Sequence, residues 1–204
     1  MPNHGLVNSE PIQALELFCG SGQLTKAWCS AGVRALGIDK PTHRHETVAP
    51  WAKMDLTRTG EQDLLVKMIS EHKPLRFVWI GVPCGTASRA REIRRGQRNE
   101  PIPLRSEPEP WGRTDISLSA KDAERVRKAN ELYRFTLRVV DLCEEKGIAW
   151  AIENPLNSLV WYCQEFQDLL NINGVSDLKF SACMFGGKRN KNRGSVAASM
   201  DWSI

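Results

Sequence analysis

Residues 14–22 have the sequence ALELFCGSG, an apolar run that ends in two closely spaced glycines. A short apolar run bounded by glycines is typical of a buried strand followed by a tight turn. Apolar residues then recur at helical spacing as far as Ala31, and Gly32 is a natural helix stop. This stretch therefore predicts a strand, a turn and a helix in succession.

Strand-like and helix-like patterns continue to alternate through most of the chain, which predicts an α/β fold with a doubly wound, mostly parallel sheet. The last two strands are expected to form a C-terminal antiparallel pair around the basic turn 186–193. The predicted strands are 14–19, 33–38, 49–54, 75–80, 148–152, 179–184 and 195–199. Beyond the first helix, the predicted helices lie around 64–69, from 119 to 147, and from 160 to 170.

The length of 204 residues suits one α/β domain. We expect residues 1–11 to be a flexible leader and 12–204 to form a single domain. Residues 85–118 are rich in Arg, Glu and Pro and lack periodic apolar residues. A loop of this length in a compact domain is usually functional or mobile.

The composition excludes several classes of protein. The six cysteines contain no Cys-x-x-Cys pair, so the default is buried, reduced thiols and no metal site. The N-terminus lacks the apolar stretch of a signal peptide, and no segment approaches the roughly 20 apolar residues of a membrane span. We therefore expect an intracellular protein that is neither secreted nor membrane-bound. The net charge of +4 is compatible with a nucleic-acid partner.

Candidate functional residues follow the predicted strands, at their carboxyl ends. These positions are 18–22, Asp39, Asp55, Pro83-Cys84 and Glu153. Ligands of doubly wound sheets bind at this edge, so we expect these residues to share one site.

The first of these positions suggest a cofactor site. Gly20, Ser21 and Gly22 open a helix, where backbone can approach a ligand closely. The carboxylate of Asp39 suits ribose hydroxyls, and the absence of a full Gly-x-Gly-x-x-Gly favours a nucleoside cofactor without a pyrophosphate. Asp55 is a candidate for the adenine amino group, with a turn or helix-cap role as the alternative.

Five segments together resemble the DNA cytosine-5 methyltransferases, in that family's order and over nearly the whole chain. They are residues 15–22, Gly37-Ile38-Asp39, Pro83-Cys84, Glu153-Asn154-Pro155 and the basic segment 188–193. The resemblance implies a Rossmann-like class I methyltransferase fold, S-adenosylmethionine as cofactor and DNA as partner. The target cytosine would be single-stranded or flipped out of the stack.

The resemblance also implies roles for individual residues. Cys84 would be the nucleophile that adds to C6 of cytosine, and Glu153 would act at N3. Arg189 or Arg193 would hold the cytosine O2 or help position Cys84. Phe18 would lie against the adenine of the cofactor, with core packing as the alternative. Pro83 would be one of the cofactor-binding residues.

The arginine-rich run after Cys84 is the candidate nucleic-acid contact. A positive neighbourhood lowers a thiol pKa, and arginines beside the nucleophile also suit phosphates. The alternative is a solvated charged loop. The predicted contacts are Ser88, Arg89, Arg91, Arg94 and Arg95.

The chain departs from the family at two points. Most members carry Gln after the nucleophile and an aromatic residue two positions further on, where this chain has Gly85 and Ala87. The target-recognition domain that usually follows the basic segment is not visible before Ile204. Either recognition is minimal, or a partner protein supplies it, or a segment is missing from the chain. The alternatives are a non-catalytic nucleic-acid-binding relative, from a mobile element or virus, and an RNA cytosine methyltransferase.

Overall fold

The structure, a computed structural model, divides into two compact units. Unit 1 comprises residues 1–81 and 138–150, and unit 2 comprises residues 82–137 and 151–204. The described residues are 11–40, 46–71, 73–93, 96 and 100–179, together with the backbone of 180 and 194–199.

Unit 1 is built on parallel strands in the order β3-β2-β1-β4. In register, Leu15 of β1 lies between Leu36 of β2 and Val78 of β4. The elements, in chain order, are β1 (Ala14–Leu17), α1 (Gln23–Ser30), β2 (Ala35–Asp39), β3 (Trp51–Lys53), α2 (Thr59–Glu71) and β4 (Phe77–Ile80).

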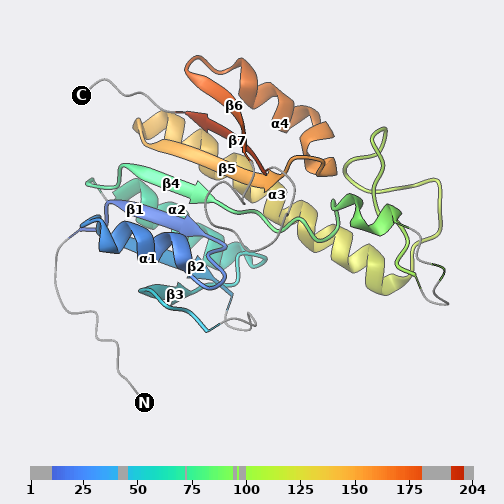
Figure 1. Ribbon diagram of the computed structural model, residues 1–204, viewed down its shortest axis with the longest axis horizontal. Helices are drawn as coiled ribbons and strands as arrows, with labels where there is room; N and C mark the ends of the chain where they lie inside the picture. Colours follow the sequence, from blue (N-terminus) through green and yellow to red (C-terminus); the bar gives the residue numbers. More distant parts are fainter. Residues whose placement is uncertain are drawn as a thin grey trace. The chain divides into compact units, whose positions relative to one another are not determined.

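The two helices of unit 1 lie on opposite faces of its strands. The connection through α1 steps from β1 to β2, whereas the connection through α2 steps from β3 back across to β4. Because such crossovers are right-handed, opposite steps place their helices on opposite faces. Figure 1 shows α1 in front of the strands and α2 behind them.

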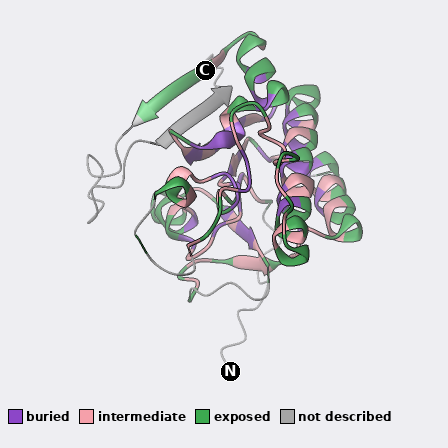
Figure 2. Ribbon diagram, turned by 90° about the vertical axis from the view of Figure 1, so that its right-hand side faces the viewer, coloured by how far each residue is buried: buried purple, intermediate pink, exposed green. Residues whose placement is uncertain are grey.

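The core of unit 1 is the central strand and the helix residues that face it. All four residues of β1 are buried, and Leu65 and Ile69 of α2 are buried as well. Figure 2 shows buried residues in the strands and exposed residues along the outer sides of the helices. A fully buried strand explains why this segment is continuously hydrophobic rather than alternating.

A long helix and a strand run from one unit into the other. The helix α3 (Ala120–Lys146) begins at Ser119, whose hydroxyl accepts from the Asp122 N–H at 3.2 Å, and ends at Gly147 with a φ of 64°. These are the start and stop expected from the sequence. The strand β5 (Ala149–Pro155) starts in unit 1, where the Ala149 N–H donates to the Arg76 carbonyl at 3.0 Å.

The expected fold class is confirmed. Strands β3-β2-β1-β4-β5 form a five-stranded parallel sheet of the Rossmann-like type, and the full strand order ends in β7 and β6. The predicted C-terminal antiparallel pair is present as β6 and β7. The elements of unit 2 besides α3 and β5 are η1 (Arg89–Glu92), η2 (Leu159–Tyr162), α4 (Gln164–Asp168), η3 (Leu169–Asn171), β6 (Val175–Phe180) and β7 (Gly194–Ser199).

Aromatic rings form much of the core of unit 2. Tyr133 of α3 packs edge-on against Phe166 of α4 with ring centroids 6.1 Å apart. Trp111 and Trp161 contact these two rings at 6.2 and 6.3 Å. Tilted and edge-to-face arrangements of this kind are the favoured geometries of aromatic pairs.

Two predicted elements differ from the structure. The helix predicted over 160–170 is broken into short pieces at Cys163, whose extended backbone separates η2 from α4. The local bonds that close these turns, including Ser158 capping η2 and Trp161 Nε1 donating to the Pro155 carbonyl, favour short pieces over one helix. The strand predicted from residue 179 begins at Val175, and residues 181–184 lie outside the described residues.

The segment 85–118 contains one short helix, η1, and no strand in its described parts. Across the described ranges, no helix is long and apolar enough to cross a membrane.

The close contact between Gly37 and Cys19 gives a test of packing in unit 1. A Cβ at residue 37 would lie 2.7 Å from the Cys19 sulfur and 3.0 Å from its Cβ. We expect Gly37→Ala to lower the free energy of unfolding by about 1–3 kcal/mol, as overpacking does, measured by urea denaturation. Gly60→Ala is the control because a Cβ there meets nothing within 4 Å. Adding Cys19→Ala to Gly37→Ala should restore part of the loss, and equal stability of all variants would contradict this packing.

Candidate active site

The turn after β1 has an unusual backbone. Phe18, Gly20 and Gly22 all have positive φ, at 61°, 53° and 70°. Glycine adopts this conformation easily, but a bulky residue such as Phe18 does so at a cost of about 1–2 kcal/mol. Such strain persists where the surroundings hold it, and it clusters at ligand sites. A Cβ on Gly20 would meet nothing within 4 Å, so the turn borders open space at this residue.

Asp39 at the end of β2 ties the turn to the neighbouring strand. Its Oδ2 accepts from the Gly20 N–H at 2.7 Å, and its Oδ1 accepts from the Lys40 N–H at 2.7 Å. Each carboxylate oxygen has a second lone pair, so both can accept a further hydrogen bond. The structure thus places two of the predicted cofactor residues in direct contact.

Asp55 takes part in a turn before α2. Its Oδ1 accepts from the N–H and the hydroxyl of Thr57 at 3.2 and 2.7 Å. Its Oδ2 lies 3.5 Å from Nε of Arg58. This is the turn geometry named as the alternative for this residue, and its contact with adenine stays a prediction.

Glu16 was not among the predicted site residues. It is buried within β1, and its Oε2 accepts from the Thr25 N–H at 2.7 Å and from the Thr25 hydroxyl at 2.5 Å. Burial raises the pKa of Glu16, and the bonds from Thr25 partly oppose that shift. These bonds join β1 to the first turn of α1. A carboxylate inside an apolar strand is the sequence signal that points to such a role.

Cys84 lies in unit 2, in the turn that follows β4. The thiol is half-buried, and the Cys84 carbonyl accepts from the Ala87 N–H at 2.9 Å. The Ala87 carbonyl in turn accepts from the Leu159 N–H at 2.9 Å. The turn is therefore fixed by backbone bonds at the residues that follow the thiol.

Side chains hold the same turn just before the thiol. The amide of Asn154 donates to the Val82 carbonyl at 2.7 Å, and the Tyr133 hydroxyl donates to the Pro83 carbonyl at 3.4 Å. Asn154 is completely buried, and its Oδ1 has no hydrogen-bond partner among the described residues. The motif Glu153-Asn154-Pro155 thus supports the Cys84 turn directly.

Glu153 precedes Asn154 on β5 and is half-buried. Burial raises the pKa of its carboxyl group. A raised pKa favours the protonated form that can donate to a ring nitrogen.

Arg105 is the second residue that the sequence did not single out. Its side chain is almost fully buried, at 1% exposure. Its Nε donates to the Thr86 hydroxyl at 3.1 Å, and its Nη1 donates to the Pro110 carbonyl at 2.6 Å. An arginine in a proline-rich loop is expected to be solvated, so no pattern in the sequence indicated this burial.

The predicted nucleic-acid contacts that are described all make bonds within unit 2. Ser88 caps η1 by accepting from the Ala90 N–H at 3.3 Å. Arg89 lies 3.3 Å from Glu92, bonds Glu107 and stacks on the Tyr162 ring at 5.5 Å. Arg91 donates to the Gly85 and Ile102 carbonyls, both at 3.2 Å. Arg94, Arg95, Arg189 and Arg193 lie outside the described residues.

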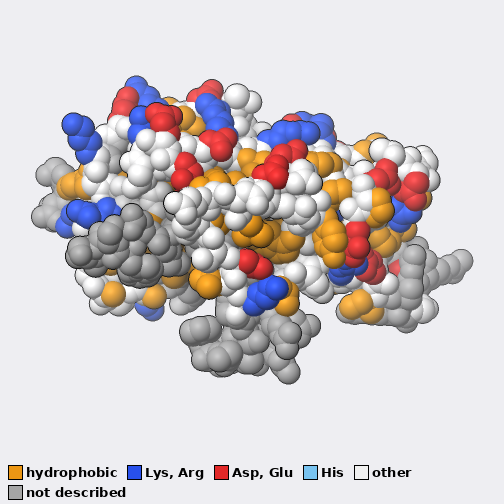
Figure 3. Space-filling model, turned by 90° about the horizontal axis from the view of Figure 1, so that it is seen from above, with side chains coloured by type: hydrophobic (Ala, Val, Ile, Leu, Met, Phe, Trp, Pro, Cys, Tyr) orange, Lys and Arg blue, Asp and Glu red, His pale blue; other side chains and the backbone are white. Residues whose placement is uncertain are grey.

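Acidic and basic side chains also mix elsewhere on the surface. On the face drawn in Figure 3, they lie interspersed rather than gathered by sign. Ion pairs between acidic and basic side chains also occur along α3, where Arg127 lies 2.7 Å from Glu124.

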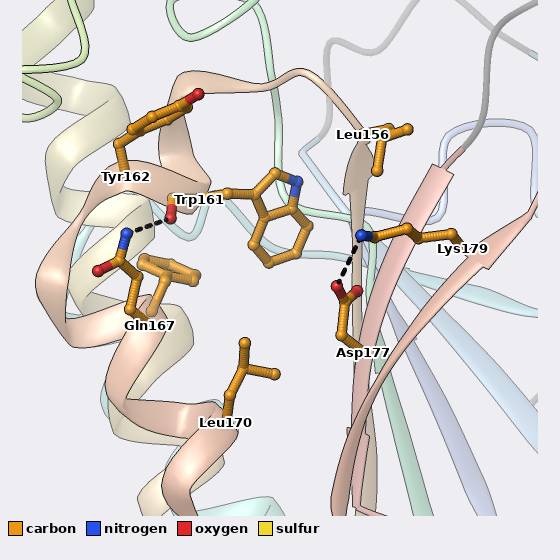
Figure 4. A pocket seen from close by; sticks show the side chains of 8 residues that line it. Leu156, Trp161, Tyr162, Gln167, Leu170, Asp177 and Lys179 are labelled. Atoms are coloured by element: carbon orange, nitrogen blue, oxygen red, sulfur yellow. Dashed lines mark hydrogen bonds and ion pairs between the residues drawn. The ribbon is translucent and has the colours of Figure 1, made fainter.

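A pocket of about 260 Å³ lies in unit 2 beside β6 (Figure 4). Its wall is largely aromatic and aliphatic, with the ion pair of Asp177 and Lys179 on one side. Neither Cys84 nor Glu153 lines it, so this pocket is separate from the predicted chemistry. The lining residues are Leu156, Trp161, Tyr162, Phe166, Gln167, Leu170, Asp177 and Lys179.

Comparison with known proteins supports the fold. No family model and no curated protein matches the sequence. The crystal structure of the S. pombe Dnmt2 methyltransferase is similar, with a TM-score of 0.51 and 14% identity over 96% of this chain and 51% of that one. The glycopeptide N-methyltransferase MtfA, solved with S-adenosyl-L-homocysteine, has a TM-score of 0.38 and 12% identity over 93% of this chain and 83% of that one.

The likeness to the S. pombe protein shows the fold alone at this level of identity. The fold is that of the Rossmann-like class I methyltransferases. The chain spans about half the length of that protein.

The buried amide of Asn154 gives a test of how the Cys84 turn is held. In Asn154→Asp, an aspartate at neutral pH cannot donate to the Val82 carbonyl and leaves a buried charge without a partner. We expect the free energy of unfolding to fall by about 3 kcal/mol, measured by chemical denaturation at pH 7. Asn157→Asp, three residues on and exposed, should change it little. Equal stability of the two variants would contradict the role of the amide.

The raised pKa of Glu153 predicts a pH-dependent cost to folding. A folded-state pKa above the unfolded value means that stability is lost as pH rises from the unfolded pKa, about 4.3, through the folded one. Glu153→Gln removes this cost, so its stability relative to the parent chain should increase between pH 4 and pH 7.5. The exposed Glu46→Gln is the control. A constant difference for Glu153→Gln across this range would refute the prediction.

Proposed function

We propose that this protein transfers a methyl group from S-adenosylmethionine to C5 of cytosine in DNA, with Cys84 as the covalent nucleophile. The observation that carries the proposal is the Cys84 turn itself. Its thiol is half-buried, and the Val82 carbonyl accepts a bond from the buried amide that directly follows Glu153. The two motifs of the resemblance therefore meet in one unit.

The residues of unit 1 fit a nucleoside cofactor. The turn with left-handed backbone at Phe18, Gly20 and Gly22 borders open space at Gly20, and Asp39 has acceptor capacity for ribose hydroxyls. Ser21 and Asp55, together with Pro83 of unit 2, complete the proposed set. When bound, S-adenosylmethionine supplies the electrophilic methyl group.

The chemistry of cytosine explains why a thiol and a carboxyl group are needed together. C5 is a weak nucleophile until the Cys84 thiolate bonds to C6, which shifts the C5–C6 electron pair toward C5 and N3. A proton held by Glu153 at N3 stabilises that charge. Once C5 has gained the methyl group, a base removes its proton. The C5–C6 double bond then re-forms, and the bond from Cys84 to C6 breaks to release the thiolate.

The proposed substrate is a cytosine that is single-stranded or flipped out of its helix, because C6 is inaccessible within the stack. Arg189 or Arg193 would hold the base. Ser88, Arg89, Arg91, Arg94 and Arg95 are the proposed backbone contacts. Three of these already bond within unit 2, so recognition by a partner protein or a further segment is part of the proposal.

Trapping with 5-fluorocytosine tests the function. Fluorine at C5 cannot leave as a proton does, so the Cys84–C6 bond should persist in the presence of S-adenosylmethionine. We expect a covalent complex on denaturing gels and a modified Cys84 peptide in mass spectrometry. Cys84→Ser should abolish the complex, and Cys29→Ser, at an exposed thiol, should leave it unchanged. A complex that survives in Cys84→Ser would overturn the assignment.

The same assay on RNA separates the substrate classes. A complex on an RNA oligonucleotide alone would assign the protein to RNA cytosine methylation. A non-catalytic relative would give no complex and, in calorimetry with S-adenosylhomocysteine, no heat of binding by the folded protein.

A further inference from the structure

Arg105 carries a buried positive charge that no described carboxylate balances. Its hydrogen-bond acceptors are the Thr86 hydroxyl and the Pro110 carbonyl, and its Nη2 has no partner among the described residues. Burial lowers the pKa of its guanidinium. A charge buried in this way is unfavourable for folding unless an opposite charge or hydrogen bonds compensate for its loss of hydration.

Arg105 is connected to the residues that precede and follow Cys84 in the chain. After the thiol, Thr86 accepts from Arg105 Nε at 3.1 Å. Before the thiol, the Pro83 carbonyl accepts from Tyr133, and the Arg105 guanidinium lies over the Tyr133 ring at 4.9 Å. The pKa of Tyr133, raised mainly by burial, is also affected by the charges of both Arg105 and Cys84. The Tyr133 side chain therefore contacts both the Arg105 guanidinium and the backbone just before Cys84.

The arginines nearer in sequence are less suited to stabilise a thiolate. Arg89 is paired with Glu92 and Glu107, which neutralise its charge. Arg91 donates to the Gly85 carbonyl from a half-exposed position, where solvent screens it. The other titratable groups beside Arg105 are Tyr133 of α3 and the buried thiol of Cys163 between η2 and α4.

We propose that Arg105 is a positioning residue that holds the Cys84 turn and stabilises the thiolate form of Cys84. It acts through Thr86 and Tyr133 and through its buried charge, without touching the substrate. The inference rests on the proposed role of Cys84 as nucleophile. It also locates the origin of thiol activation in the segment 85–118, at a residue 21 positions after the cysteine.

Alkylation of Cys84 tests this without requiring methyl transfer. The full chain is treated briefly with iodoacetamide from pH 6 to 9.5, and the Cys84 peptide is quantified by mass spectrometry. In Arg105→Met we expect the midpoint of the alkylation profile to rise by about one pH unit, with a several-fold slower reaction at pH 7. Arg105→Lys keeps the charge and should shift the midpoint less. Arg113→Met removes the same charge from an arginine paired with Asp115 and should leave the profile unchanged.

Circular dichroism and thermal unfolding establish that each variant is folded. If Arg105→Met does not fold, Thr86→Val removes only the acceptor of Nε at nearly constant volume, and it should still raise the midpoint. An unchanged midpoint in a folded Arg105→Met or Thr86→Val variant would overturn the proposal. A shifted midpoint without adduct formation on 5-fluorocytosine would instead refute the proposed function and leave the role of Arg105 standing.

Discussion

The hydrogen bond from the Asn154 amide to the Val82 carbonyl is the constraint on which the candidate chemistry depends. It joins the end of β5 to the turn that follows β4, and it is completely buried. Because a buried carbonyl without a partner is costly, this turn has few alternative conformations. Cys84, two residues after Val82, is thereby held at a defined place, and the residue before Asn154 is Glu153, whose carboxyl pKa burial raises.

In unit 1, side-chain hydrogen bonds to the backbone also fix the segments that follow the strands. There the buried carboxylate of Glu16 fixes the start of α1 through Thr25, and Asp39 holds the turn through the Gly20 N–H. In both units a polar side chain on a strand accepts from or donates to the backbone of a neighbouring segment. These bonds support backbone conformations, such as that of Phe18, that local preference alone would disfavour.

The sequence was sufficient to predict the structural features that depend on local residue patterns. The alternation of strands and helices, the cap at Ser119 and the stop at Gly147 follow from periodicity and capping, and each is present. The helix predicted over 160–170 was wrong as one element. The Leu159 N–H donates to the distant Ala87 carbonyl and the Trp161 Nε1 donates to the nearby Pro155 carbonyl, and apolar periodicity contains neither bond. The burial of Arg105 was missed for the same reason. The predicted cofactor residues Gly20 and Asp39 do meet, since Gly20 follows β1 and Asp39 is the last residue of the adjacent parallel strand β2. Their roles toward a ligand stay predictions.

The central claim is that the Cys84 thiol makes cytosine C5 reactive, and the identity of the methylated atom tests it most directly. The full chain is incubated with DNA and S-adenosylmethionine that carries a trideuterated methyl group, and the nucleosides are analysed by mass spectrometry. The account predicts labelled 5-methyldeoxycytidine from the parent chain and none from Cys84→Ser. Label on the exocyclic N4 of cytosine, or label at C5 that persists without Cys84, would contradict it.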